Sequence, residues 1–466
     1  PGNIGEASAV GVTIVMLGVI FGKPFAESSF GPNLVFSKET LSIMLPAYAA
    51  IASILPVWVL MCPRDYLSSY MKIGVIAVLA VGIFVAHPDL KMPATTPFMS
   101  GGGPVINAPI WPFLCIVIMC GAISGFHSLV ASGTTPKMVY RESDIKLLGY
   151  GAMVLEGVVA VTALVAACSL EPGDYFAINC EKARYAQTAP KVLAENNWNI
   201  APVELRALER GVKEDLEGRP GGAVTLAVGM AKVFSNLPGM DTLMSYWYHF
   251  VIMFEALFIL TLLETGTRVA RFVFQETLAG FDTAPTTEAE ARASDPSAAA
   301  KSPIKRKVNW PLNVGMSLLV CFLWGYMLYR GDLETLWRML GIVNQLLATT
   351  ALAVATTYLL LHAPKRVYAL LTAVPFVFLV VTVFAAGVIS LQQWWGEIGK
   401  LQAKMATLEG AELTAADRQL FMWRLVCVLA VIMLALVAVV VVDAVRRWYQ
   451  ILSSAVPASQ IEAAGK

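Results

Sequence analysis

Residues 111–138 read WPFLCIVIMCGAISGFHSLVASGTTPKM, an apolar run that passes directly into a stretch of small and polar residues. The part 111–131 has the length of about 20 residues that a helix needs to cross a bilayer. The following stretch, 121–138, carries a histidine, three serines, two threonines, a proline and a lysine. Polar side chains at membrane depth are costly and usually functional. These residues therefore predict a membrane span with a site built into it.

The composition of the whole chain agrees with a membrane protein. Hydrophobic residues make up 57% of it and charged residues only 14%, whereas soluble domains are near 25% charged. We therefore expect an all-α, multi-pass membrane protein. The net charge is +1 without a basic stripe, so no nucleic-acid partner is expected. The seven cysteines have no CxxC spacing, which indicates neither a disulfide framework nor a zinc site.

Hydropathy predicts about ten transmembrane helices. Their expected ranges are 7–22, 41–61, 67–86, 111–131, 149–169, 243–263, 312–329, 342–361, 367–389 and 423–444. The piece 221–234, GGAVTLAVGMAKVF, is too short and too rich in glycine to cross, so we expect a re-entrant or interfacial helix there. The sequence begins with Pro1 and enters an apolar run almost at once, which suggests the later part of a longer protein.

Three regions follow from this pattern. Residues 1–282 form a central transport region of six spans, which includes an external segment, 171–242. Residues 283–308 are rich in Ala, Pro, Ser and Thr and predict a flexible cytoplasmic linker. Residues 309–466 form a C-terminal region of four spans. Lys and Arg near the linker, among them Arg268 and Arg271, place this side in the cytoplasm by the positive-inside rule.

The polar stretch offers candidate ligand-binding residues. If it stays helical, the hydroxyls of Ser124, Ser128, Ser132 and Thr135 share one face, with Gly125, His127 and Thr134 beside them. Such a face can line a cavity for a carboxylate or carbonyl ligand, and unwinding at Gly133 would add free amides. The alternative is that the hydroxyls bond to their own helix and pack against a neighbour. His127 can carry a proton or be a neutral packing residue.

Three further residues are candidates for proton coupling. Glu156 and Glu255 lie within apolar spans, and an intramembrane carboxylate is a functional candidate by default. His249 lies six residues before Glu255, on a different helix face, so the two are not expected to pair. The alternative for each carboxylate is a structural hydrogen bond between helices. Asn344 and Gln345, near the start of another span, are candidates for reading the substrate or for joining helices.

No cofactor is indicated by the motifs. The sequence lacks GxxxxGK[ST] and HExxH, so neither nucleotide hydrolysis nor a zinc protease site is expected, and the protein is not expected to be an enzyme. Only four histidines are present, without an evident pair for haem. Prolines and glycines, such as Pro46, Pro56 and the run 101–103, instead interrupt or flank apolar segments. Membrane transporters use such interruptions to build substrate sites, although they also simply kink helices.

Several of these segments together resemble the carbon starvation protein A (CstA) family. They are GAISGFHSLVASGTTPKM with GYGAMVLEG, VLMCPRDYLSSYMKIG (59–74), YHFVIMFEALFILTLLETGTRVARF (248–272) and LWRMLGIVNQLLA (336–348). The resemblance implies a bacterial inner-membrane transporter of pyruvate or small peptides within the amino acid–polyamine–cation superfamily. It also implies two inverted five-helix repeats like those of LeuT, and further N-terminal spans that this chain lacks.

The leading functional hypothesis is a proton-coupled secondary transporter for pyruvate or a related small carboxylate. Its partners would be that substrate, protons or Na⁺, the lipid bilayer and the missing N-terminal part of the same protein; a small companion protein is left open. Uptake of small peptides is the alternative within the same class. A nutrient-sensing receptor would need a folded cytoplasmic domain, and a subunit of a respiratory complex would need histidine pairs or a quinone site.

Overall fold

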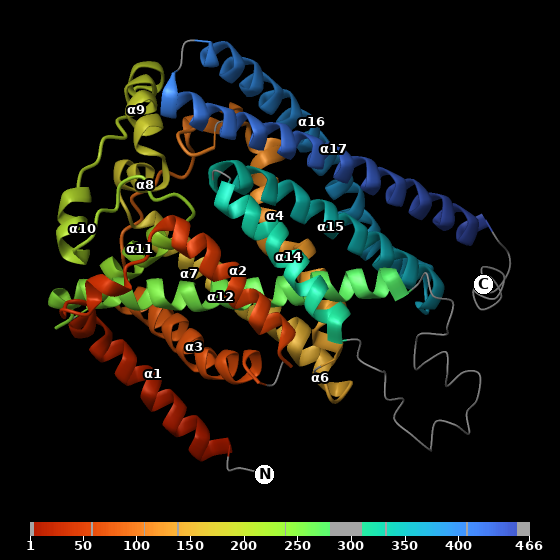
Figure 1. Cartoon of the computed structure of the whole chain (residues 1–466), viewed down its shortest axis with the longest axis horizontal. Coiled ribbons are helices and arrows are strands. Elements are labelled where there is room, and N and C mark those ends of the chain that lie inside the picture. Colours follow the sequence, from red (N-terminus) through yellow and green to blue (C-terminus); the bar gives the residue numbers. More distant parts are fainter. Residues whose placement is uncertain are drawn as a thin grey trace. The chain divides into compact units, whose positions relative to one another are not determined.

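The computed structural model describes residues 4–56, 59–106, 108–137, 139–237, 239–279, 310–330, 333–406 and 409–453. Within these ranges every regular element is a helix, as Figure 1 shows along the chain. The expectation of an all-α polytopic membrane protein is confirmed. The expected linker, 283–308, lies outside the described residues.

The chain divides into two compact units that are not continuous in sequence. The first unit comprises Pro1–Ala108, Met138–Arg268 and Asn309–Ser317, and the second comprises Pro109–Lys137, Val269–Val308 and Leu318–Lys466. Helices of the first unit are α1 (Ile4–Ala26), α2 (Lys38–Ile54), α3 (Met61–Ala86), α6 (Ser143–Lys146), α7 (Ala152–Cys168), α8 (Pro172–Asn179), α9 (Lys182–Asn196), α10 (Leu205–Val212) and α11 (Ala223–Ser235). Those of the second are α4 (Cys115–Ala122), α5 (Gly125–Gly133), α15 (Leu333–His362), α16 (Leu370–Met405) and α17 (Gly410–Ser453). The unit boundaries fall inside α12 (Met244–Ala279) and α14 (Trp310–Arg330).

Eight helical segments in the described residues are long and apolar enough to cross a membrane. They are Met61–Ala86, Ile110–Gly133, Ser143–Cys168, Met244–Gln275, Pro311–Tyr329, Gly341–His362, Arg366–Met405 and Glu412–Ser453. The expected span 7–22 corresponds to a shorter apolar stretch, Ser8–Gly22, within α1. The expected span 41–61 is wrong in extent, because α2 has 17 residues and ends at Ile54. Leu55 has extended backbone angles (φ −64°, ψ 148°), which the following Pro56 favours.

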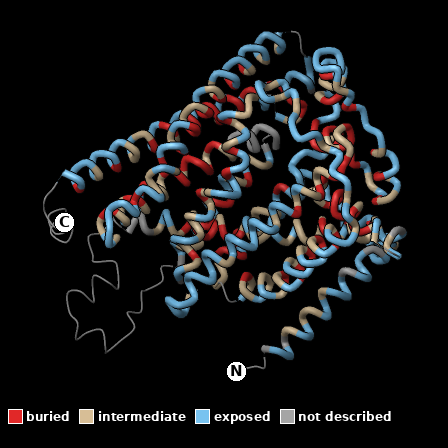
Figure 2. The backbone as a smooth tube through the Cα atoms, turned by 180° about the vertical axis from the view of Figure 1, so that it is seen from behind, coloured by how far each residue is buried: buried red, intermediate tan, exposed pale blue. Residues whose placement is uncertain are grey.

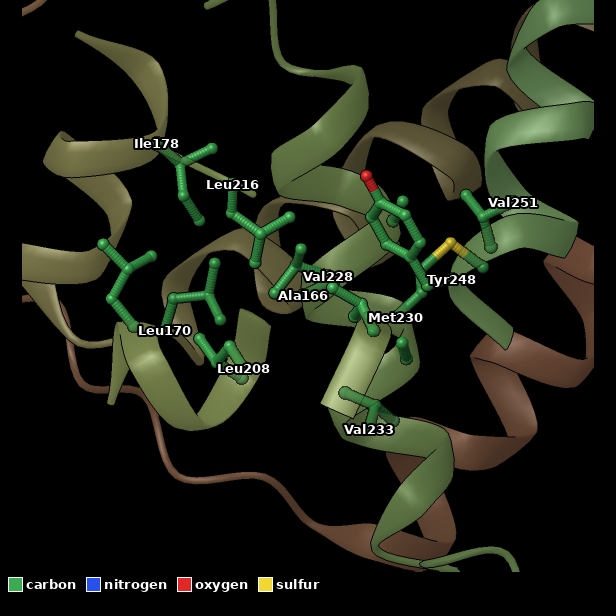
Figure 3. Close-up of a cluster of buried hydrophobic side chains, with 14 of the residues drawn as sticks. Ala166, Leu170, Ile178, Leu208, Leu216, Val228, Met230, Val233, Tyr248 and Val251 are labelled. Atoms are coloured by element: carbon green, nitrogen blue, oxygen red, sulfur yellow. The ribbon is translucent and has the colours of Figure 1, made fainter. Parts of the chain in front are cut away.

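The core of the first unit is built around α11, which packs against α3 and α7. Ala227, Val228, Ala231 and Val233 have no exposed surface, and Figure 3 shows Val228 and Val233 among side chains from neighbouring helices. The contact with α7 is close because a Cβ atom added at Gly229 would overlap the carbonyl of Ala166. The short helix expected at 221–234 is therefore present as 13 residues enclosed by protein; its re-entrant placement stays a prediction.

The segment before α11 is folded as well. It holds three short helices, α8, α9 and α10. The Asp174 side chain is fully buried, and its Oδ1 accepts hydrogen bonds from the amides of Val203 (2.9 Å), Glu204 (3.2 Å) and Leu205 (3.1 Å). These amides precede and begin α10, so one carboxylate supplies the acceptor that a helix N-terminus lacks.

The second unit is formed by α15, α16 and α17, which pack against one another, while α4 and α5 pack against α15. Leu346, Leu379, Val383 and Val426 are fully buried in its core. Figure 2 shows buried and exposed positions alternating along the helices. Many exposed positions of α17 are apolar, for example Val431 and Leu436, as expected where a helix faces lipid.

Candidate functional site: the break between α4 and α5

The polar stretch of the fourth expected span contains a break in the helix. Ile123 (φ −140°, ψ 83°) and Ser124 (φ −93°, ψ 132°) leave helical geometry, so α4 ends at Ala122 and α5 starts at Gly125. The helix was expected to continue through Ser124 or to unwind at Gly133. It breaks instead at Ile123–Ser124, and α5 ends at Gly133, before a 3₁₀ turn at Thr135–Lys137. Ser124 and Thr135 therefore lie outside α5, and the four hydroxyls do not form one helical stripe.

Asn344 of α15 connects the two sides of the break. Its Oδ1 accepts hydrogen bonds from Ser124 Oγ (3.1 Å) and from the Phe126 amide (2.9 Å) in the first turn of α5. Its Nδ2 lies 3.3 Å from Cys120 Sγ in α4. The Asn344 side chain thus satisfies one of the first amides of α5, which have no partner within their own helix.

Gly125 and Gln345 complete this contact. A Cβ atom added at Gly125 would overlap the Asn344 carbonyl oxygen and the Leu347 side chain, so only glycine allows α5 to lie this close to α15. Gln345 has no exposed surface; its Nε2 lies 3.5 Å from the Ile116 carbonyl in α4, and its Oε1 has no hydrogen-bond partner among the described residues. A buried, unpaired amide oxygen is costly and calls for an explanation.

The other candidates of the stretch are placed differently. Ser128 Oγ donates to the Gly125 carbonyl (2.6 Å), and Ser132 Oγ donates to the Leu129 carbonyl (3.2 Å). Thr134 is buried and its hydroxyl lies 3.5 Å from the Val130 carbonyl. These bonds to the helix's own carbonyls are the alternative considered from the sequence. His127 is exposed on the same helix.

The three candidates for proton coupling do not lie together. Glu255 is half-buried in the middle of α12 and has no hydrogen bond or ion pair within the part of the chain that the structure describes. Glu156 is exposed on α7. His249 is near the start of α12, where Nδ1 lies 2.7 Å from the Ser245 carbonyl and Nε2 lies 3.3 Å from Glu214 Oε1. His249 and Glu255 are thus not a pair, as expected.

Glu214 and His249 border a cavity of about 370 Å³ in the first unit, together with Lys213 and Ser245. Hydrogen bonding to His249 and an ion pair with Arg219 (2.8 Å) lower the pKa of the Glu214 carboxyl to about 2. This carboxylate lies outside the candidate membrane spans. It therefore stays ionised at every physiological pH.

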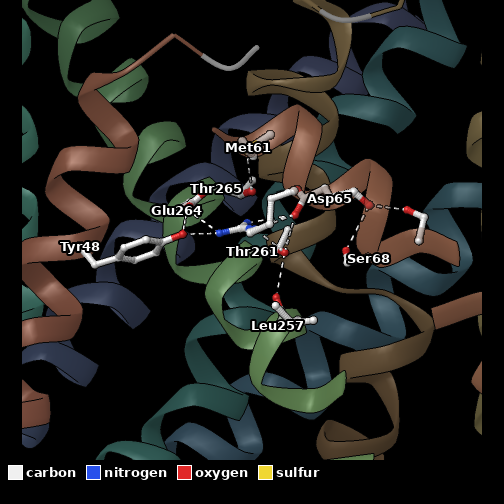
Figure 4. A network of polar contacts seen from close by, with 10 residues as sticks. Tyr48, Met61, Asp65, Ser68, Leu257, Thr261, Glu264 and Thr265 are labelled. Atoms are coloured by element: carbon white, nitrogen blue, oxygen red, sulfur yellow. Dashed lines mark hydrogen bonds and ion pairs between the residues drawn. The ribbon is translucent and has the colours of Figure 1, made fainter. Parts of the chain in front are cut away.

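A polar network that was not predicted from the sequence joins α2, α3 and α12, as Figure 4 shows. Arg64 Nη1 lies 2.6 Å from Glu264 Oε1, and Arg64 Nη2 lies 2.9 Å from Asp65 Oδ1. The Tyr48 hydroxyl donates to the same Glu264 oxygen, at 2.5 Å. An adjacent Arg and Asp within an otherwise apolar helix was the available signal, because intramembrane charges are rare.

Arg268 adds a second contact between the same helices. Its guanidinium donates to the carbonyls of Ala52 (2.7 Å) and Leu55 (3.0 Å), which lie at the C-terminal end of α2. Cations stabilise this end of a helix because its last carbonyls are unpaired. Arg268, which was expected to belong to the cytoplasmic segment, is 2% exposed and fixes the end of α2.

The fold is that of an all-helical, multi-pass membrane protein, and secondary transporters characteristically place a helix broken in this way at the substrate site. The chain belongs to the carbon starvation protein CstA family, whose model matches residues 1–386. No solved structure matches it.

Curated relatives agree with this assignment. The chain is 42% identical to the Peptide transporter CstA of Bacillus subtilis, over 96% of this chain and 67% of that protein. It is 39% identical to the Pyruvate/proton symporter BtsT of Escherichia coli, over 83% of this chain and 56% of that protein, and 40% identical to the Peptide transporter CstA of the same organism, over 83% and 55%. These relatives are named as transporters rather than enzymes. The chain spans between about half and two thirds of their length.

Proposed function

We propose that this chain forms part of a secondary transporter that imports pyruvate or a related small carboxylate, coupled to protons. The site of action is the bacterial cytoplasmic membrane. Family membership supports transport in general, and the relative named as a pyruvate/proton symporter supports this substrate and this coupling ion.

The observation that carries the proposal is the break at Ile123–Ser124 inside the candidate span Ile110–Gly133. Non-helical backbone at membrane depth is tolerated only where protein encloses it or where it lines a cavity. The start of α5 presents amides and a partial positive charge, which favour a carboxylate. Ser124 and Asn344 lie at this point, where their hydroxyl and amide groups can exchange their mutual hydrogen bond for bonds to a ligand.

The proposed substrate-binding residues fall into two groups. Ser124, Gly125, Asn344 and Gln345 surround the break itself, and the unpaired Oε1 of Gln345 is an acceptor for a ligand or water. His127, Ser128, Ser132, Gly133, Thr134 and Thr135 lie along or just after α5. They would contact the substrate further along its path through the membrane, because the hydroxyls of Ser128, Ser132 and Thr134 already bond to carbonyls of their own helix.

Proton coupling is assigned first to Glu255. It is the half-buried carboxylate in the middle of a candidate span, without a bonding partner among the described residues, so protonation would remove a poorly compensated charge. His249 and Glu156 are secondary candidates, since His249 is held by Glu214 and Glu156 is exposed.

Uptake of small peptides is the second candidate function. It is favoured by the relatives named as peptide transporters, one of which is 42% identical to this chain. A peptide carries an ammonium group in addition to its carboxylate, and so needs a carboxylate or several carbonyls at the other end of the site.

The test is uptake of labelled pyruvate by proteoliposomes that contain the full-length protein, with a pH gradient imposed and Na⁺ absent. Wild type is compared with Glu255→Gln and with Glu412→Gln, a control at an exposed position of α17. We expect uptake to follow the gradient in wild type and control, and to lose this dependence in Glu255→Gln. Uptake of a labelled dipeptide in place of pyruvate would favour the second function.

A further inference from the structure

Glu264 lies at the centre of the polar network in the first unit. We call Tyr48, Arg64, Asp65, Thr261 and Glu264 the Glu264 cluster. Besides the contacts given above, Thr261 Oγ1 donates to Asp65 Oδ1 (2.8 Å), and Arg64 Nη2 lies 3.2 Å from the Thr261 hydroxyl. The cluster thus holds two carboxylates that share one guanidinium.

The two oxygens of Glu264 have different surroundings. Oε1 accepts from Arg64 and from Tyr48, whereas Oε2 is buried and has no hydrogen-bond partner among the described residues. The whole side chain has 0% exposed surface. Burying an ionised carboxylate is costly unless its oxygens are paired and hydrogen-bonded. Glu264 is therefore only half compensated.

The nearby charges do not supply the missing partner. Those that interact with Glu264 are Tyr48 on α2, Arg64 on α3 and Arg268 on α12. Asp65 and Lys72 on α3 interact with Arg64, and Cys62 interacts with Arg268. Arg268 already donates to two carbonyls of α2, and the Lys72 ammonium lies over the Phe258 ring at 5.6 Å. Arg64 is the cation in contact with Glu264, and Asp65 competes for it.

The geometry points to Glu264 as a reversible proton-binding site, with Oε2 as the atom that takes the proton. The proton reaches Glu264 from water on the side of the cluster where Asp65 and Arg64 lie. The side chains of Asp65 and Arg64 are 24% and 17% exposed. Binding converts Glu264 to the neutral acid and weakens its ion pair with Arg64, which keeps its bonds to Asp65. Release of the proton restores the pair.

This assignment rests on the proposed proton-coupled transport and adds a second titrating carboxylate to Glu255. Its consequence is mechanical. The Arg64–Glu264 pair joins α3 to α12 across 200 positions of sequence, so the contact is strong only while Glu264 is ionised. A proton that enters the cluster would loosen α12 from α3, and its departure would rejoin them.

The test measures proton binding directly, without substrate. Infrared difference spectra of the full-length protein in lipid are recorded between neutral and acidic pH, and the carbonyl stretch of protonated carboxyl groups is followed. We expect the band to form reversibly in wild type and in Glu412→Gln, the control at an exposed position of α17, and to lack one component, that of Glu264, in Glu264→Gln. A band that persists unchanged in Glu264→Gln, or one that Na⁺ addition rather than pH controls, overturns the assignment.

A second variant tests the assignment if Glu264→Gln does not fold. Tyr48→Phe keeps the carboxyl group and removes the hydroxyl that donates to Oε1, so the carbonyl stretch of the protonated Glu264 carboxyl should move to a different frequency. A band at the wild-type frequency would contradict the assignment. The two proposals fail separately: proton-driven pyruvate uptake without a Glu264-dependent band refutes the proton site alone, and the band without pyruvate uptake refutes the transported substrate alone.

Discussion

Removal of the Asn344 side chain should destabilise the break between α4 and α5 by a predictable amount. Asn344→Ala deletes the hydrogen bonds to Ser124 Oγ (3.1 Å) and to the Phe126 amide (2.9 Å). Each neutral hydrogen bond contributes about 1 kcal/mol, and a buried amide left without an acceptor costs about 1–3 kcal/mol. The free energy of unfolding should therefore fall by about 2–4 kcal/mol.

Ser124→Ala should lower the free energy of unfolding by a smaller amount than Asn344→Ala. It removes one bond together with its donor, so a loss of about 1 kcal/mol is expected. Because both variants delete the same Ser124–Asn344 bond, the double variant should cost about 1 kcal/mol less than the sum of the two single variants.

The assay is denaturant unfolding of the purified full-length protein in mixed micelles, followed by circular dichroism. Gln402→Ala, at an exposed position of α16, is the control and should change stability by less than about 0.5 kcal/mol. If Asn344→Ala is no more damaging than this control, or if the effects of the double variant are simply additive, Asn344 does not hold the break and the reasoning is wrong.

Three further predictions concern other parts of the fold. Gly125→Ala should push α5 away from α15, because the new Cβ would overlap the Asn344 carbonyl; thermal stability should fall more than in Gly157→Ala, where no atom lies within 4 Å of the added Cβ. Asp174→Ala should cost about 3 kcal/mol or more, since three backbone amides lose a charged, buried acceptor, and hydrogen exchange at residues 203–205 should speed up. The Glu214 carboxyl has a pKa lowered to about 2, so its contribution to stability is complete above the unfolded pKa of about 4.3 and is lost as the pH falls toward about 2. In Glu214→Gln the melting temperature should therefore depend less on pH in this window. An unchanged pH dependence of the melting temperature would contradict the pairing with His249.

Apolar runs predicted most of the helices because the bilayer imposes both length and composition. The expected spans 67–86 and 342–361 lie inside α3 and α15. The error at 41–61 came from reading Pro56 as a kink inside a helix, whereas the extended Leu55 before it ends α2. The local sequence, a proline after Leu55, therefore already indicates the end of α2.

The exact site could not be predicted because its determinants are distant in sequence. Neither Ile123 nor Ser124 is a helix breaker by itself, and the break depends on Asn344, which is 220 positions away from Ser124. The polar stretch therefore indicates the region of the site, but not the hydrogen bonds to Asn344 that hold the break. Likewise, Arg64 and Glu264 each look like charges near the end of an apolar segment, and only the packing of α3 against α12 reveals one network.

The most direct test of the central claim, that the break binds the carboxylate, is equilibrium binding of labelled pyruvate to the purified full-length protein. Ser124→Ala is compared with Ser453→Ala, which removes the same group from an exposed position at the end of α17. We predict saturable binding that Ser124→Ala weakens about fivefold, the equivalent of one hydrogen bond of about 1 kcal/mol, and that Ser453→Ala leaves nearly unchanged. Equal affinity in wild type and Ser124→Ala, or binding of a dipeptide but not of pyruvate, would contradict the account.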